Sequence, residues 1–306
     1  MNKKNITFDF VGKRKIWYII SLIIIVAGMV SFAVQGLNFG IDFTGGSYLQ
    51  LSFYENAPAE GEEATAEHVE VSLADLRAVV NEHVDQTPTI QYDETNTSYI
   101  IRTELTSEDQ VNELLAAIES EIGAYQVDRT ELVGPTIGAE LVKKAILALI
   151  IACGLMLVYI TVRFQFWFGV SSIIALLHDA LIVLSIFSIF QLEVSSSFIA
   201  AILTVIGYSI NATIVLFDRV RESKPNFKAS EKKALINDSI SNTLARSINT
   251  TITTLLTLLA LIIFGGDTTK VFVFAMIVGI VAGFYSSVFI SGSLYHDLSR
   301  FSKKNK

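Results

Sequence analysis

The sequence predicts an α-helical membrane protein with six transmembrane helices. A ferredoxin-like α+β domain is expected outside the membrane, between the first and second helices. Three observations predict this architecture. Apolar residues make up 51% of the chain and charged residues only 17%, a composition unusual for a water-soluble globular protein. The apolar residues gather in long runs, and the acidic residues gather between the first two of them.

Six apolar stretches are long enough to cross a bilayer, whose hydrocarbon core of roughly 30 Å needs about 20 residues of helix. The fifth stretch is the weakest because it carries many threonines. The first follows Lys13, Arg14 and Lys15, as a signal peptide would. It is longer than a signal-peptide core of about 7–15 residues, so we interpret it as a retained anchor. The stretches cover residues 16–34, 145–162, 168–190, 198–217, 248–264 and 271–294.

The distribution of Lys and Arg predicts the orientation, because cytoplasmic segments carry an excess of these residues. With the N-terminus in the cytoplasm, the inner segments hold 17 of the 23 basic residues. Both termini are therefore expected in the cytoplasm. The predicted parts are an N-terminus with the first helix (1–35), an extracytoplasmic domain (36–138) and the remaining five helices (139–306) with a cytoplasmic loop (218–247).

The extracytoplasmic domain holds 20 acidic and three basic residues. This acidity indicates either a solvated surface or a docking surface for basic partners. Alternating and helical hydrophobic patterns predict the order β-α-β-β-α-β of a ferredoxin-like fold, which hosts many functions. Residues 55–70 form an acidic loop. The expected elements are strands over 47–54, 89–92, 99–102 and 125–133, and helices over 73–84 and from Ser107 onward.

Polar residues inside the spans form the candidate functional site, because ionisable groups in a membrane are costly. His178 and Asp179 lie in the middle of the third span. We expect the stripes on the fourth and fifth spans to face the bundle interior, where Asp179 could pair with Arg246. A threonine stripe can also serve only helix packing. The stripes contain Thr204, Tyr208, Asn211 and Asp218 on the fourth span, and Arg246, Thr250, Thr253 and Thr257 on the fifth.

Two further patterns are open to structural interpretations. Asp218 lies beside Arg219 and Arg221 at the cytoplasmic end of the fourth span, where these residues can form a simple interfacial charge cluster. In the sixth span, small residues recur every four positions, which lets helices approach closely. This face packs either within the chain or against a partner. Its members are Ala275, Gly279, Gly283, Ser287 and Ser291.

The sequence contains no known enzyme signature: it has no zinc-binding His-Glu-x-x-His, no phosphate loop and no nucleophile elbow. Neighbouring residues on a helix point about 100° apart, so His178 and Asp179 are not expected to pair, and a hydrolytic site is disfavoured. With one cysteine, Cys153, no disulfide can form within the chain. We expect no catalytic activity, no cofactor or metal, and no nucleic-acid partner.

Five strings, taken in order, resemble the SecF family of bacterial protein-export subunits. The first two flank the predicted extracytoplasmic domain, and the others lie in the third, fourth and fifth spans. They are GIDFTGG (40–46), VGPTIG (133–138), HD (178–179), GYSINATIVLFDRVRE (207–222) and RSINTTITT (246–254). The resemblance covers nearly the whole chain.

The resemblance implies a partner, SecD, and membership of the resistance-nodulation-division superfamily. It implies a multi-pass protein of the bacterial cytoplasmic membrane that uses the ion-motive force to help preproteins leave the SecYEG channel after insertion by SecA. The coupling ion would be H⁺ or Na⁺. The candidate ion-pathway residues are Asp179, Asn211, Arg246 and Thr250. Of these, Asp179 and Arg246 match the aspartate and the arginine of the family's third and fifth spans.

One position departs from the family pattern. Many members carry an Asp directly after the Asn of the fourth span, and this chain has Ala212 after Asn211. Our hypothesis is that SecD supplies the main titrating carboxylate. The alternatives are an independent small-molecule exporter of the same superfamily and a purely structural subunit. The exporter is disfavoured because such exporters carry two six-span halves, and the scaffold because Asp179 and Arg246 are costly in a membrane.

Overall fold

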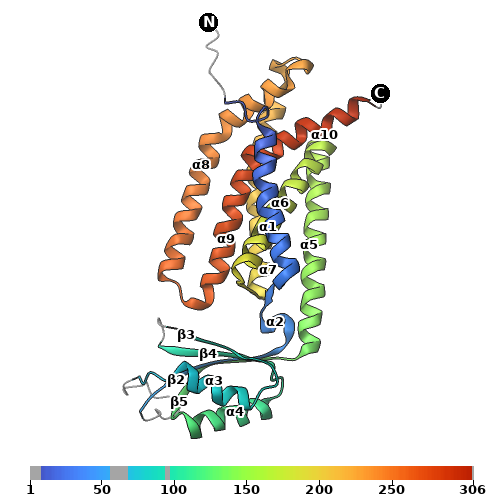
Figure 1. Ribbon diagram of the computed structural model, residues 1–306. Coiled ribbons are helices and arrows are strands. Elements are labelled where there is room, and N and C mark those ends of the chain that lie inside the picture. The colour runs from blue at the N-terminus through green and yellow to red at the C-terminus, as the bar shows by residue number, and fades with distance from the viewer. Residues whose placement is uncertain (1–7, 56–67, 94–96, 305–306) are drawn as a thin grey trace. The chain divides into compact units, whose positions relative to one another are not determined.

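A computed structural model describes residues 8–55, 68–93 and 97–304. The chain forms two compact units: Phe39–Ile146 make up a sheet unit, and the rest of the described chain makes up a helical unit. Helix α5 (Pro135–Arg163) runs from the first into the second (Figure 1).

The helical unit contains the six predicted spans, and each helix is longer than the apolar stretch that predicted it. Most of the segment 218–247, expected as a loop, is helical as well. The helices are α1 (Arg14–Gln35), α5, α6 (Phe166–Phe190), α7 (Ser196–Ser223), α8 (Lys232–Phe264) and α9 (Asp267–Tyr285), which continues through η3 (Ser286–Ser291) into α10 (Gly292–Lys304). Short elements β6 (Glu193–Val194), η1 (Lys224–Asn226) and η2 (Ala229–Glu231) connect them.

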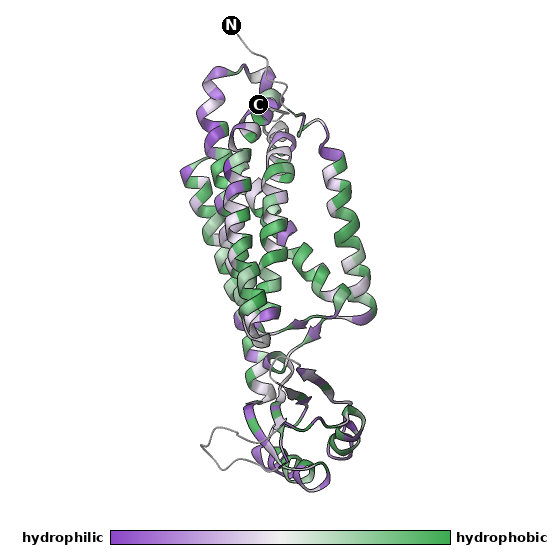
Figure 2. Cartoon of the chain, turned by 90° about the vertical axis from the view of Figure 1, so that its left-hand side faces the viewer, coloured by the Kyte–Doolittle hydropathy of each residue, from purple (hydrophilic) through white to green (hydrophobic). Residues whose placement is uncertain are grey.

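Helices α6, α7 and the α9 segment form the centre of this unit. Within the apolar 18-residue segment of each helix, 50%, 44% and 56% of the residues of α6, α7 and the α9 segment are buried. The corresponding shares are 11% for α1, 6% for α5 and 17% for α8. Figure 2 shows hydrophobic colour along the helices and hydrophilic colour at the end of this unit that carries both termini. Apolar surface this extensive requires lipid or further protein around it, because water would disfavour it.

The small residues of the sixth span pack within the chain, which resolves the alternative left open by the sequence. A Cβ built at Gly279 would lie 2.4 Å from Val205 Cγ2, and one at Gly283 would lie 2.9 Å from Ser209 Cβ, both on α7. Ser287 is buried too. Glycine at these positions therefore sets the close approach of α9 to α7.

The sheet unit has the predicted β-α-β-β-α-β order, with element bounds close to those expected. Its main sheet has four strands, all antiparallel, in the spatial order β3-β4-β2-β5, and the two-residue strand β1 is not part of it. Residues 94–96, between the second and third strands, and residues 56–67 of the predicted acidic loop lie outside the described residues. The elements are β1 (Asn38–Phe39), α2 (Ile41–Thr44), β2 (Gly46–Phe53), α3 (Leu73–Glu82), β3 (Thr89–Asp93), β4 (Ser98–Thr103), α4 (Glu108–Glu121) and β5 (Tyr125–Val133).

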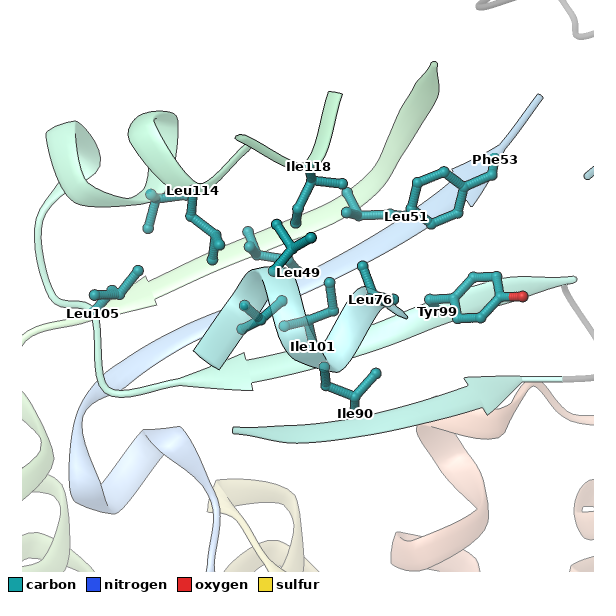
Figure 3. Packing of buried hydrophobic residues seen from close by; sticks show 13 residues of the cluster. Leu49, Leu51, Phe53, Leu76, Ile90, Tyr99, Ile101, Leu105, Leu114 and Ile118 are labelled. Atoms are coloured by element: carbon teal, nitrogen blue, oxygen red, sulfur yellow. The ribbon is translucent and has the colours of Figure 1, made fainter. Parts of the chain in front are cut away.

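Helices α3 and α4 contribute to the core of this unit together with alternate residues of the central strand (Figure 3). Leu49, Leu51 and Phe53 of β2 point to the same face because side chains alternate along a strand. Leu76 of α3 and Leu114 of α4 cover them and are fully buried. The core therefore follows from the two hydrophobic periods in the sequence.

The glycines that flank this domain are required by close backbone contacts. Gly46 has φ +125°, and a Cβ there would lie 2.2 Å from the carbonyl oxygen of Thr103. A Cβ at Gly138 would lie 2.7 Å from the carbonyl oxygen of Phe43. The strings at 40–46 and 133–138 therefore meet in space, and only glycine fits at these two contacts.

A short turn before α1 is tied to the first turns of α8. The Asp9 carboxylate accepts hydrogen bonds from Lys233 Nζ at 2.7 Å, Asn237 Nδ2 at 2.8 Å and Gly12 N at 2.9 Å. Val11 N donates to Asn237 Oδ1 at 3.0 Å, and Val11 is fully buried. This turn holds the start of α1 against α8.

We expect this contact to weaken in acid. Burial raises the pKa of Asp9, but hydrogen bonds from Lys233, Asn237 and Gly12 outweigh it, so the pKa lies below 3.8. An aspartate whose pKa is lower in the folded chain than in the unfolded chain stabilises the fold at pH values above its unfolded-state pKa. This contribution is lost as the pH falls through its folded-state pKa. At pH 7, Asp9→Asn should therefore lower the free energy of unfolding by less than about 1 kcal/mol, because the Asp9–Lys233 pair is exposed. The apparent melting temperature should fall slightly. The difference from the unmodified protein should narrow below pH 4; a constant difference would contradict the assignment.

Candidate functional site

Asp179 is a fully buried carboxylate in the middle of α6. Its Oδ2 accepts hydrogen bonds from Ser209 Oγ of α7 at 2.6 Å and from Ser286 Oγ, the first residue of η3, at 2.8 Å. Its Oδ1 contacts His178 Nδ1 at 2.9 Å. Three donors on the two oxygens offset much of the cost of burying this group.

His178 extends these contacts to a fourth helix. Its Nε2 lies 2.8 Å from Ser21 Oγ of α1, and its ring stacks on Tyr285 with 6.0 Å between the ring centroids. With Nδ1 donating to the carboxylate, a neutral His178 accepts the Ser21 hydroxyl at Nε2. We call Ser21, His178, Asp179, Ser209 and Ser286 the Asp179 cluster; it joins α1, α6, α7 and the α9–η3 segment.

Local sequence explains why the helices can meet at this carboxylate. Gly283 lets α9 approach α7 at Ser209, three residues before Ser286. Ser286 begins a segment of π-helix, in which hydrogen bonds reach one residue further than in an α-helix. Such segments are rare and are frequent at functional sites. Close helix packing and local widening together bring the Ser286 hydroxyl to Asp179.

The expectation that His178 and Asp179 cannot pair is wrong. Their Cα–Cβ bonds diverge, but the side-chain torsions bring Nδ1 and Oδ1 within hydrogen-bonding distance. Ser21, His178 and Asp179 even follow the order of a Ser-His-Asp triad. All three side chains are buried between helices, so a substrate carbonyl could not reach Ser21. The geometry suits a hydrogen-bonded relay and not a hydrolytic site.

The predicted stripes on α7 and α8 lie on a different face from the Asp179 cluster. Asn211, Asp218, Arg246 and Thr250 are all exposed in this chain, so the expectation that they face its interior is wrong. Among the residues that the structure describes, no side chain pairs with Arg246, and the possible Asp179–Arg246 pair is not formed. Asp179 is instead satisfied by hydroxyl groups and His178.

A contact between α7 and α8 sets the register of these exposed residues. Thr254 Oγ1 donates to Tyr208 Oη at 3.3 Å. Asn211 and Thr250 each lie about one helical turn from this contact, towards the end that carries the termini. We call Asn211, Asp218, Arg246 and Thr250 the polar stripe.

The charge cluster at the end of α7 divides into separate contacts. Arg219 Nη1 pairs with Glu222 Oε2 at 2.8 Å on the same helix. Arg221 Nη1 donates to the carbonyl oxygen of Arg163 at 3.4 Å, away from this pair. Asp218 is exposed beside them and forms no ion pair with a described residue.

Sequence reasoning missed the serines of the Asp179 cluster. Ser209 lies inside the string at 207–222, and Ser286 directly precedes Ser287 of the small-residue pattern. For Ser286, the available signal was its position three residues after Gly283 of the small-residue pattern. In the described part of the chain, no group of three or more His, Cys, Asp or Glu side chains could hold a metal ion.

Comparison with known proteins places these features in a family. The family described as "Protein export membrane protein SecD/SecF, C-terminal" matches residues 111–300, and the "SecD/SecF GG Motif" matches residues 30–53. The protein translocase subunit SecF of Sebaldella termitidis is 38% identical over 96% of this chain and 92% of its own length. The chain belongs to the SecF family.

Other SecF relatives and solved structures agree. SecF of Haemophilus influenzae is 34% identical over 95% of this chain and 86% of its own length. The crystal structure of SecDF from Thermus thermophilus, described as a translocon-associated membrane protein, superposes with a TM-score of 0.81 at 32% identity over 98% of this chain. SecDF in its super-membrane-facing form gives 0.69 at 33% identity over the whole chain. This chain spans 40% of the length of each SecDF chain.

Proposed function

We propose that this chain is an auxiliary subunit of the Sec protein-export machinery that works with SecD. Together they would use the ion-motive force to promote preprotein translocation and release on the outer side of the membrane. The family match over nearly the whole chain carries this proposal. The buried Asp179 cluster supports an active role, because a scaffold has no need of a carboxylate in the middle of its bundle.

The polar stripe supports SecD as the partner. Asn211, Arg246 and Thr250 would face lipid if the chain were alone, and lipid disfavours such groups. A second bundle that covers α7 and α8 would remove them from lipid. The match covers 40% of the SecDF chain, and in the proposed assembly SecD would supply the second bundle.

Within this assembly, the ion pathway would involve two sets of residues. Asp179 would form part of a buried relay, and Asn211, Arg246 and Thr250 would line the interface with SecD. Because Ala212 replaces the usual Asp, SecD would supply the main titrating carboxylate. The ion would be H⁺ or Na⁺; hydroxyl, amide and carboxylate oxygens suit either one.

The charge distribution supports the orientation and location. The basic residues concentrate at the end of the helical unit that carries both termini, so both termini would lie in the cytoplasm of a bacterial cell, in the cytoplasmic membrane. The sheet unit, with the strand order of a ferredoxin-like domain, would then lie outside. SecYEG, SecA and the translocating preprotein would be the indirect partners.

Pulse-chase export of a signal-peptide-bearing protein tests this function. In cells depleted of the chain, we expect precursor to accumulate, and resupply of the chain should clear it. Unchanged export together with a rise in sensitivity to small hydrophobic molecules would favour the independent exporter and contradict the proposal.

A further inference from the structure

Two arginines from different helices meet where α5 ends. Arg163 is the last residue of α5, and Arg221 lies in the last turn of α7. Their guanidinium carbons lie 5.2 and 5.9 Å from the centroid of the Phe164 ring. Arg221 also donates to the Arg163 carbonyl oxygen. The fold therefore holds two positive charges around one ring.

Neither charge is neutralised by the described part of the chain. No described carboxylate forms an ion pair with Arg163 or Arg221, whereas the neighbouring Arg219 pairs with Glu222. Both arginine side chains are exposed. Two like charges held together repel, and an anion bound between them would convert this repulsion into attraction.

The surroundings of this pair resemble the boundary between lipid and water. Phe166, directly after the α5–α6 connection, is 54% exposed, and it is followed by Trp167, a residue type that gathers at membrane interfaces. Along α5, exposed apolar side chains lead towards Arg163 at helical spacing. These are Leu155, Val158, Tyr159 and Val162. An apolar strip thus ends at a doubly charged site.

We propose that Arg163 and Arg221 bind the phosphate headgroup of an anionic phospholipid whose acyl chains lie along the exposed face of α5. Guanidinium groups bind phosphate oxygens through paired N–H donors. The apolar strip favours a lipid over free phosphate, which has nothing to place against Leu155 or Tyr159. Basic sites between helices at the cytoplasmic surface suit such headgroups.

The site also lies where α5 is held to its neighbour. A Cβ at Gly169 of α6 would lie 2.9 Å from Thr161 Oγ1 and 3.2 Å from Leu157 Cδ1 of α5. Most of the remaining length of α5 is exposed. A headgroup bound by Arg163 and Arg221 joins α5 to α7, next to the contact between α5 and α6 at Gly169.

Lipid retention by the full-length protein tests the proposal. The protein, purified in detergent, is titrated with phosphatidylglycerol or phosphatidylcholine, and bound lipid is counted by native mass spectrometry. We expect Arg163→Gln/Arg221→Gln to retain about tenfold less phosphatidylglycerol than the unmodified chain, with phosphatidylcholine unchanged. The matched control, Lys15→Gln/Lys224→Gln, removes two exposed charges from the same end and should retain both lipids normally.

Three outcomes would overturn the proposal. The first is that the arginine variant retains as much phosphatidylglycerol as the unmodified chain. The second is that the lysine control loses as much phosphatidylglycerol as the arginine variant. The third is that millimolar inorganic phosphate displaces the lipid. The last would identify a free-anion site. If the double variant is not monodisperse, Arg221→Gln alone is measured; it should lose phosphatidylglycerol severalfold, and Arg221→Lys should recover part of it.

Discussion

Asp179→Asn should reduce export to about the rate of cells that lack the chain, while the protein still assembles in the membrane. Asparagine has the shape of aspartate, so the helices can keep their positions. Its NH₂ group donates hydrogen bonds, and it must take the place of a carboxylate oxygen that accepted them from a serine hydroxyl or from His178. The relay from Ser21 to Ser209 and Ser286 is then broken, at a cost of about 1–3 kcal/mol for an unsatisfied buried group.

Pulse-chase export and co-purification with SecD measure the two halves of this prediction. The control is Asp238→Asn on α8, whose carboxylate accepts a hydrogen bond from Asn242 at 2.9 Å and lies outside the Asp179 cluster. It should support normal export. Normal export by the Asp179 variant would remove this carboxylate from the mechanism, and loss of SecD co-purification would point to a structural role instead.

Gly28→Ala should detach α1 from α6 and strongly lower the thermal stability of the protein. A Cβ at Gly28 would lie 2.1 Å from Ser185 Cβ and 2.5 Å from its Cα, so α6 backbone and α1 cannot keep their present distance. Overpacking costs about 1–3 kcal/mol, and more where backbone must move. The displacement also stretches the contact from Ser31 Oγ to Ser188 Oγ, now 2.9 Å.

The matched control is Gly154→Ala in α5, where an added Cβ meets no atom within 4 Å. Alanine is the better helix former, so this variant should be as stable as the unmodified protein or slightly more so. The measurement is the apparent melting temperature of each full-length variant in detergent. Equal melting of the two variants would show that the α1–α6 contact is not close.

Features that depend on local sequence were predicted well. Apolar run length is a local property, and it found all six spans, although the helices continue past each run. Alternation at Leu49, Leu51 and Phe53 and helical spacing at Leu114 and Ile118 found the sheet unit and its core. Helix ends were missed because polar residues outside the membrane continue a helix without an apolar pattern.

The candidate site was predicted less completely. Asp179 was identified because a carboxylate within an apolar run is costly. Its partners were not: sequence suggested Arg246, whereas the fold supplies Ser209, Ser286 and His178. A buried carboxylate can be satisfied by several neutral donors, and sequence does not tell which donors lie within reach.

The sequence by itself predicted six membrane spans and one acidic insertion between the first two of them, and its ordered strings resemble the SecF family. Those conclusions depend on composition, length and order along the chain. Only the tertiary structure decided which side of each helix faces which neighbour. The rotation of α6, α7 and α9 about their axes depends on glycine contacts such as Gly279 against Val205. That rotation places Ser209 inside the bundle, next to Asp179. Asn211, two residues later, lies on the outside because successive residues on a helix point about 100° apart.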